Sequence, residues 1–258
     1  MIGAELVENM AGSDALGWSA ALAAPFIGSF VGVLVRRLPE GRPVVRARSQ
    51  CEACGAVLGA GDLVPLASWV ALRGRCRRCG ARLGWFYPAI ELAALAVALG
   101  ALAVDRGAAV SVWLDCVLGW WLLALGATDL RSWLLPDLLT LPLVLAGLAV
   151  TLWLDPAALL QSALGAALGY LSLRAIAWAY RALRGRDGLG EGDAKLLAAS
   201  GAWLGIAALP QVVLAAAIGA LLAALGLRLA GARIGARSAL PFGPFLALAT
   251  WVLWLTMR

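Results

Sequence analysis

The chain has 258 residues, 62% of them hydrophobic, with a mean hydropathy of +0.87 and a formal net charge of +6. Soluble domains are about 45–50% apolar, so this composition excludes an ordinary soluble domain. The sequence contains no histidine, which excludes histidine-based metal sites, a Ser-His-Asp triad and a Cys-His dyad. Any hydrolytic chemistry must therefore use carboxylates, lysine, serine or cysteine.

Eight apolar stretches follow one another along the chain, each close to the roughly 20 residues that cross a bilayer as a helix. They predict an all-α fold, a polytopic membrane helix bundle of about eight spans surrounded by membrane lipid. We divide the chain into an N-terminal span (1–35), a polar loop domain (36–84) and a transmembrane domain (85–258). The predicted spans are 17–35, 86–104, 108–128, 138–154, 157–180, 194–208, 210–228 and 241–257.

The basic residues predict the orientation of these spans. If the N-terminus lies outside and the spans alternate, every Lys and Arg except Arg106 and Arg258 falls in or beside an inside segment. Short cytoplasmic loops of membrane proteins collect Lys and Arg. We therefore expect the N-terminus outside, and we attribute the positive charge to topology rather than to binding of nucleic acid.

The long inside loop contains two C-x-x-C pairs, Cys51 with Cys54 and Cys76 with Cys79. Two such pairs can bind Zn²⁺ through four thiolates, which leaves no open coordination position for catalysis. Two disulfides or four free thiols are the alternatives, but stable disulfides are rare in the reducing compartment on the inside of a membrane. We therefore predict a small cytoplasmic insertion with a structural zinc site.

Two aspartates stand at the inner ends of predicted spans. Asp129 ends the third span, and Asp193 ends a glycine-rich segment just before the sixth. The predicted topology places both carboxylates at the inner membrane face, where they could meet. An aspartyl protease needs two carboxylates that share one proton: one takes a proton from the attacking water, and the other protonates the leaving amine. We therefore predict Asp129 and Asp193 as a catalytic dyad.

Other roles for the acidic residues stay open. Asp193 could cap the helix that follows it, and Asp129 could be an ordinary interfacial charge. Asp137 suits the N-terminus of the fourth span and is the nearby rival to Asp129 as a dyad partner. Glu91 suits the first turn of the second span in the same way. Asp115 lies near the outer end of the third span, so we expect water at the interface to solvate it.

Several motifs together resemble the type IV prepilin peptidase family, a branch of the GxGD intramembrane aspartyl proteases. The resemblance covers nearly the whole chain. Asp129 in DLRSWLLPD and Asp193 in GEGD, followed by AKLL, are similar to the two catalytic aspartates of the family. The other similar segments are Gly28-Ser29-Phe30, Arg37-Leu38-Pro39, DLVPLASWVALRGRCRRCG with Tyr87-Pro88 and Glu91, and Pro241-Phe242-Gly243-Pro244.

The resemblance implies a bacterial inner-membrane enzyme that acts at the cytoplasmic face. Its implied substrates are type IV prepilins and the pseudopilins of type II secretion, cleaved after a glycine that ends a short basic leader. Many members also methylate the new N-terminus with S-adenosylmethionine. Because the leaders are basic, we expect Glu191, Asp137 and Glu91 to help receive them. Gly190 and Gly192 would let the substrate backbone approach closely.

Two positions depart from the family pattern. Glu52 stands where the first cysteine pair often has proline, and Gly32 stands where the N-terminal motif often has asparagine. Neither change touches the aspartates, so the departures bear on methylation rather than on proteolysis. A function of a different class also stays open: a zinc-bearing membrane adaptor without protease activity that binds a cytoplasmic partner through its basic loop.

Overall fold

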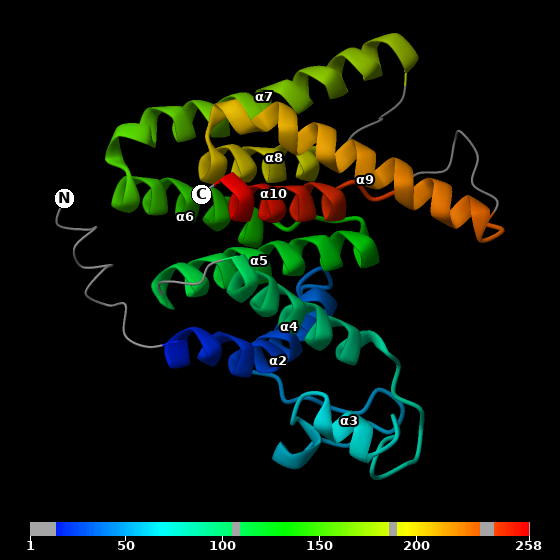
Figure 1. The fold of residues 1–258 in the computed structure, drawn as a ribbon. Coiled ribbons are helices and arrows are strands. Elements are labelled where there is room, and N and C mark those ends of the chain that lie inside the picture. Colours follow the sequence, from blue (N-terminus) through cyan, green and yellow to red (C-terminus); the bar gives the residue numbers. More distant parts are fainter. Residues whose placement is uncertain (1–13, 105–108, 186–189, 233–239, 258) are drawn as a thin grey trace. The chain divides into compact units, whose positions relative to one another are not determined.

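The computed structural model describes residues 14–104, 109–185, 190–232 and 240–257, and the regular structure in these ranges is helical (Figure 1). Isolated antiparallel bridges join Gln50 to Val57 and Arg75 to Arg82. The α-helices are α2 (Asp14–Arg37), α3 (Ala67–Ala71), α4 (Phe86–Val104), α5 (Ala109–Ser132), α6 (Asp137–Leu154), α7 (Leu159–Arg184), α8 (Glu191–Leu204), α9 (Leu209–Leu229) and α10 (Gly243–Met257). The short 3-10 helices are η1 (Ala60–Asp62), η2 (Pro156–Ala158) and η3 (Ile206–Ala208).

Within the described ranges, six helices are long and apolar enough to cross a membrane. They correspond to six of the predicted spans: 17–35, 86–104, 108–128, 138–154, 157–180 and 210–228. The other two predicted spans form α8, with 14 residues, and α10, with 15 residues. At about 1.5 Å per residue both fall short of the roughly 30 Å hydrocarbon core. The polytopic all-α fold is confirmed, whereas the count of about eight spans is not.

The chain divides into two compact units, with the boundary between Trp120 and Trp121 inside α5. The first unit holds α2, the cysteine loop with α3, α4 and the first half of α5. Gly28 lets α2 pack closely on α4, because an added Cβ there would lie 2.7 Å from the Cα of Glu91. The indole N–H of Trp120 donates to the carbonyl of Ala94 at 2.9 Å, which fixes α5 against α4.

In the second unit α8 is the central helix, packed against α6, α7 and α10 (Figure 1). Most of its residues are buried. It meets α7 through small residues: an added Cβ on Gly201 would clash with the carbonyl of Gly165, and one on Gly169 would lie 2.6 Å from the carbonyl oxygen of Leu197. Small residues let helix backbones approach closely in a membrane, where packing rather than hydrophobicity drives association. The first turn of α8 is thereby held in place.

A tight connection joins α5 to α6. The N–H of Trp133 donates to the carbonyl of Asp129 at 2.9 Å, and Trp133 has a φ of 56°. This left-handed conformation is uncommon for a residue other than glycine. Leu135 then packs on the first turn of α8, where an added Cβ on Gly192 would lie 2.7 Å from the Cβ of Leu135. The connection thus lies directly against the start of α8.

Candidate functional site

Asp129 lies near the C-terminal end of α5 and is only 6% exposed. Its Oδ2 accepts a hydrogen bond from the backbone N–H of Gly243 at 3.0 Å. Gly243 is the first residue of α10, so this N–H belongs to the group that a helix leaves unpaired at its N-terminus. An added Cβ on Gly243 would lie 2.6 Å from the same oxygen. A side chain at position 243 would enter the space in which the Asp129 carboxylate lies, and glycine keeps that space free.

Asp193 is the third residue of α8 and is 9% exposed. Its carboxylate accepts a hydrogen bond from the backbone N–H of Gly190, the residue that caps the helix. A side chain at the third helical position that bonds back to the cap residue forms one half of a capping box. The capping role that the sequence left open for Asp193 is therefore present. It explains why α8 begins where it does.

The structure brings Asp129 and Asp193 within electrostatic reach of each other. Each carboxylate accepts an N–H at the start of a helix, α10 or α8, and the positive end of a helix dipole favours negative charge. Two neighbouring buried carboxylates resist double ionisation and can share one proton. Such a pair can act as a general base toward water and as a general acid toward a leaving group.

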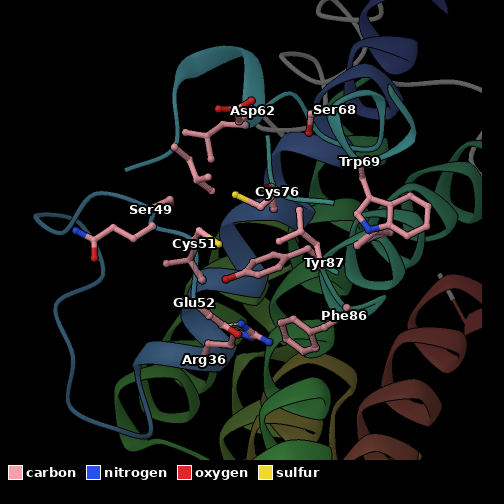
Figure 2. Close-up of a pocket in the computed structure, with 18 of the residues that line it drawn as sticks. Arg36, Ser49, Cys51, Glu52, Asp62, Ser68, Trp69, Cys76, Phe86 and Tyr87 are labelled. Carbon is pink, nitrogen blue, oxygen red and sulfur yellow. Dashed lines mark ion pairs between the residues drawn. The ribbon is translucent and has the colours of Figure 1, made fainter. Parts of the chain in front are cut away.

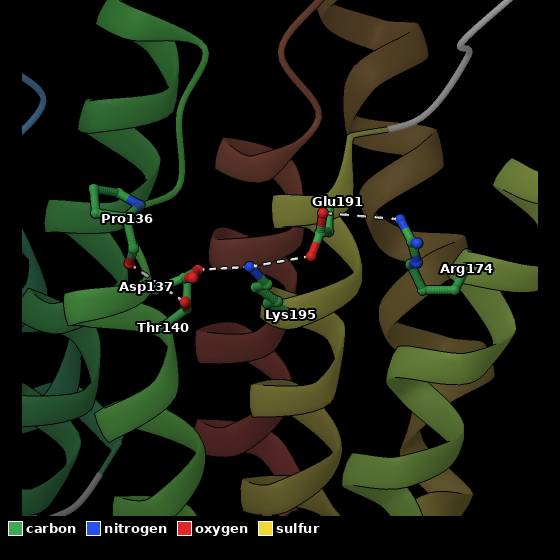
Figure 3. A network of polar contacts seen from close by, with 6 residues as sticks. All are labelled: Pro136, Asp137, Thr140, Arg174, Glu191 and Lys195. Atoms are coloured by element: carbon green, nitrogen blue, oxygen red, sulfur yellow. Dashed lines mark hydrogen bonds and ion pairs between the residues drawn. The ribbon is translucent and has the colours of Figure 1, made fainter.

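Figure 3 shows a chain of ion pairs that joins α6, α7 and α8. The Nζ of Lys195 lies 2.6 Å from Asp137 Oδ1 and 3.3 Å from Glu191 Oε1. Arg174 Nη1 lies 4.0 Å from Glu191 Oε2. Asp137 and Glu191, which we expect to receive a basic leader, thus already have cationic partners. Sequence reasoning missed Lys195 and Arg174, although the i,i+4 spacing of Glu191 and Lys195 could have revealed that pair.

The remaining predicted substrate residues have structural partners of their own. Gly190 caps α8, and Gly192 packs against the connection between α5 and α6. Glu91 is 5% exposed, and its carboxylate accepts the backbone N–H of Leu66 at 2.8 Å, which ties the loop to α4. Substrate contacts by these residues stay predictions. The expectation for Asp115 was wrong: it is 2% exposed, buried by the packing around α5 rather than solvated.

The four cysteines of the loop converge in the first unit. Their sulfur atoms all lie within 4.8 Å of one another, with Cys51 and Cys76 buried and Cys54 and Cys79 exposed. Backbone N–H groups of Cys79 and Arg78 donate to the Cys76 sulfur and lower the pKa of its thiol to about 6. The backbone N–H of Ala81 lowers the pKa of the Cys79 thiol, but contact with Cys54 and burial outweigh it and raise that pKa to about 11. A thiolate is the form that binds a metal. The cluster can therefore hold a metal ion.

The two cysteine pairs sit on matching turns. Gly55 has a φ of 68° and donates its N–H to the carbonyl of Cys51 at 2.8 Å. Gly80 has a φ of 69° and donates to the carbonyl of Cys76 at 3.0 Å. Glycine adopts this left-handed conformation without steric cost. Each turn thus brings both cysteines of its pair to the same side, as a four-sulfur site requires.

A pocket of about 990 Å³ lies beside the buried cysteines in the same unit (Figure 2). Arg36 forms an ion pair with Glu52, and its guanidinium lies 4.9 Å and 5.1 Å from the ring centres of Phe86 and Tyr87. Among the described residues, Arg36 Nε and Trp69 Nε1 are buried donors without a hydrogen-bond partner. Buried donors are normally paired. Both residues line the pocket, which points to a ligand that carries an acceptor group.

Comparison with known proteins gives matches along most of the chain. The Bacterial Peptidase A24 N-terminal domain matches residues 22–104, and the Type IV leader peptidase family matches residues 116–225. A prepilin leader peptidase/N-methyltransferase of Burkholderia pseudomallei (strain K96243) is 45% identical over 249 residues, covering 86% of this chain and 79% of the relative. Proteins of the same name match from Dickeya chrysanthemi (42% identity, 86% of each chain) and Pseudomonas aeruginosa (37% identity, 88% of this chain and 85% of the relative). The search of solved structures found no match.

The two matched domains divide the sites between them. The first contains the four cysteines and the pocket with Arg36 and Trp69. The second contains Asp129, Asp193 and the ion pairs of Lys195. The resemblance drawn from the motifs is confirmed by these matches.

Proposed function

Because this chain belongs to the type IV leader peptidase family, we propose that it is a membrane-embedded aspartyl endopeptidase that removes the leader peptides of type IV prepilins and pseudopilins. The observation that supports this reaction most directly is the pair of buried carboxylates, Asp129 and Asp193, each held by an N–H at the start of a helix. The chain is a multi-pass membrane protein. A substrate with an apolar segment would lie in the same bilayer as the pair.

In the proposed reaction, the ionised member of the dyad takes a proton from a water molecule, and the water oxygen forms a bond to the scissile carbonyl carbon. The protonated member first donates a hydrogen bond to the carbonyl oxygen and then gives its proton to the leaving amine. The C–N bond breaks, and the leader leaves with a new carboxyl group. After both transfers the dyad again holds one proton, with the two carboxylates having exchanged roles.

We place the active site at the cytoplasmic face of the bacterial inner membrane, with the N-terminus outside. The support is the distribution of Lys and Arg, which gather in the segments that this orientation puts inside. Asp129, at the C-terminal end of α5, and Asp193, at the N-terminal end of α8, then both lie at that face. Glu191, Asp137 and Glu91 remain our candidates for receiving the basic leader, with Gly190 and Gly192 beside the substrate backbone.

We propose zinc as the metal of the cysteine cluster. Four thiolates at mutual distances of up to 4.8 Å suit a tetrahedral ion with bonds of about 2.3 Å. Four protein ligands leave no place for a reacting water, so the role is structural. The ion would hold the matching turns of Gly55 and Gly80 together.

Following the names of the relatives, we propose that the new N-terminal amine is also methylated with S-adenosylmethionine as the methyl donor. When bound, this donor supplies a methyl group to the amine nitrogen while the C–S bonding electrons stay on sulfur and the amine releases a proton. The pocket of the first unit supports this proposal, because its volume of about 990 Å³ lies within the roughly 300–1,000 Å³ typical of ligand pockets. Arg36 and Trp69 would hold its carboxylate through their unpaired N–H groups.

The proposed proteolysis predicts that Asp129→Asn and Asp193→Asn each lower cleavage at least about 100-fold, because general acid–base catalysis contributes roughly 10²–10⁴-fold. The measurement is cleavage, in liposomes, of a prepilin-like peptide with a basic leader that ends in glycine. Asp155→Asn is the matched control: Asp155 accepts the N–H of Ala157 at 3.2 Å to cap η2, and asparagine can do the same.

Wild-type rates in either aspartate variant would contradict the proposed dyad. If the wild-type protein inserts and binds zinc but cleaves no such peptide, the adaptor function becomes the better explanation. Membrane insertion and zinc content are therefore measured for every variant alongside cleavage.

A further inference from the structure

Lys195 connects the first turns of two helices in the second unit (Figure 3). Its ion pair with Glu191 lies within α8, whereas its ion pair with Asp137 joins α8 to the first residue of α6. Lys195 is 20% exposed at its side chain, and Asp137 is 58% exposed. The shorter contact, at 2.6 Å, is the one between the helices. This pair therefore fixes where α6 begins relative to α8.

The ion pair of Lys195 with Asp137 also links the two segments that carry the aspartates of the dyad. Asp129 is followed by the end of α5 and the short connection to Asp137, while Asp193 precedes Lys195 by two residues on α8. On an α-helix, residues two apart point to nearly opposite faces. Asp193 therefore faces Asp129 while Lys195 faces α6. Movement of α6 away from α8 would pull the connection, and Asp129 with it.

The connection needs such a restraint because its own conformation is unfavourable. The left-handed φ of 56° at Trp133 causes steric strain that glycine would avoid. The contact of Leu135 with Gly192 holds the middle of the connection against α8. The ion pair of Asp137 with Lys195 holds its far end.

We propose that Lys195 is a positioning residue for the aspartate dyad, and that its ion pair with Asp137 holds the end of α5 against the start of α8. The inference rests on the proposed proteolysis. An exposed ion pair contributes little to global stability. Its loss would therefore loosen the site without unfolding the protein, and a misplacement of about 1 Å in a reacting group can cost roughly 100-fold in rate.

The first test separates kcat from KM in the peptide cleavage assay. We expect Lys195→Met and Asp137→Asn to lower kcat about tenfold or more. Lys195→Met leaves in place the acidic residues proposed to receive the leader, so it should keep KM within about twofold of wild type. Lys195→Arg should restore most of the rate, since arginine can pair with Asp137. Arg174→Gln is the matched control, because it removes the outer ion pair of the same network and leaves the pair with Asp137 intact. A raised KM with unchanged kcat would overturn the inference and assign these residues to substrate contact.

The second test does not depend on cleavage. Hydrogen–deuterium exchange should speed up in Lys195→Met at the connection between α5 and α6 and at the first turn of α8, and should stay as in wild type in Arg174→Gln. Unchanged exchange in Lys195→Met would overturn the inference even if the wild-type enzyme is active. Absence of cleavage by the wild type, with the exchange result as expected, would instead count against the proposed function.

Discussion

Gly243 illustrates at the scale of one residue how α10 contributes to the site. Its N–H binds Asp129 Oδ2 at 3.0 Å, and the space of its missing side chain is filled by that carboxylate. Gly126 lies one turn before Asp129 on α5, and an added Cβ there would lie 3.3 Å from the Cα of Pro244. The sequence singled out the segment Pro241–Pro244 only through its resemblance to the family. The structure gives a physical reason for this segment: it lets α10 begin in contact with Asp129.

This geometry predicts that Gly243→Ala lowers cleavage about 100-fold while the protein still inserts, because the added methyl group would displace Asp129 from its donor. Gly226→Ala in α9 is the control, since an added Cβ there meets no atom within 4 Å. The measurement is kcat for both variants with the prepilin-like peptide. Equal rates for the two variants would show that Asp129 does not need the α10 N–H.

Some site residues could be predicted from the sequence and others could not. Asp129 and Asp193 stand at span ends on the same predicted side, so topology alone suggested that they meet. The ion pair of Lys195 with Asp137 was missed because the two residues lie 58 positions apart, and no local pattern connects them. Asp115 was misjudged because depth along a span does not reveal which face of the helix packs against protein.

At the scale of the element, α8 is the central helix of its unit. Like α10 it is shorter than a span, and most of its residues are buried between α6, α7 and α10. Its contact with α7 depends on backbone touching backbone at Gly165 and Gly201. The helix that carries Asp193 is therefore held in place by close packing against its neighbouring helices rather than by contact with lipid.

We expect Gly201→Ala to destabilise the protein by about 1–3 kcal/mol, as overpacking of a close contact does. The added Cβ would meet the carbonyl of Gly165, and backbone cannot rotate away as a side chain can. The measurement is thermal unfolding in detergent, with Ala166→Ser on α7 as a small change near the same contact. An unfolding temperature equal to wild type would mean that α7 and α8 separate more easily than this packing indicates.

The sequence predicted where the helices lie more reliably than which of them are long enough to cross the membrane. The span predicted at 86–104 is the helix Phe86–Val104, because its apolar run is bounded by a charged loop. The span predicted at 194–208 instead begins at Glu191 and ends at Leu204. Hydropathy could not distinguish an inner helix covered by protein from a span covered by lipid, since both are apolar on all sides.

At the scale of the whole molecule, the division into two units separates the metal cluster from the dyad. The cysteines lie in the unit that ends at Trp120, and both aspartates lie in the unit that begins at Trp121. A continuous helix, α5, contributes to both units. The boundary inside a helix could not be seen in the sequence, where only the polar loop at 36–84 stood out.

The position of the cysteine cluster in its own unit predicts which part of the protein changes when the metal is lost. We expect Cys76→Ser to lose most of its zinc and to be cut faster by trypsin after the arginines of residues 36–84, because binding of a structural metal is coupled to folding of its site. Cys116→Ser is the control: Cys116 is fully buried in α5, outside the cluster, and this variant should keep about one zinc per chain. Metal content by mass spectrometry and limited proteolysis provide the measurements. Full zinc in Cys76→Ser would contradict a four-cysteine site.

The hydrogen bond between Gly243 and Asp129 joins positions 114 residues apart. A ribosome adds about 5–20 residues per second, so the donor is synthesised roughly ten seconds after the carboxylate that it serves. During that interval α5 has entered the membrane while Asp129 still lacks its donor from α10. With the proposed dyad, the nascent chain would have a complete site only after α10 has been synthesised and has packed against Asp129.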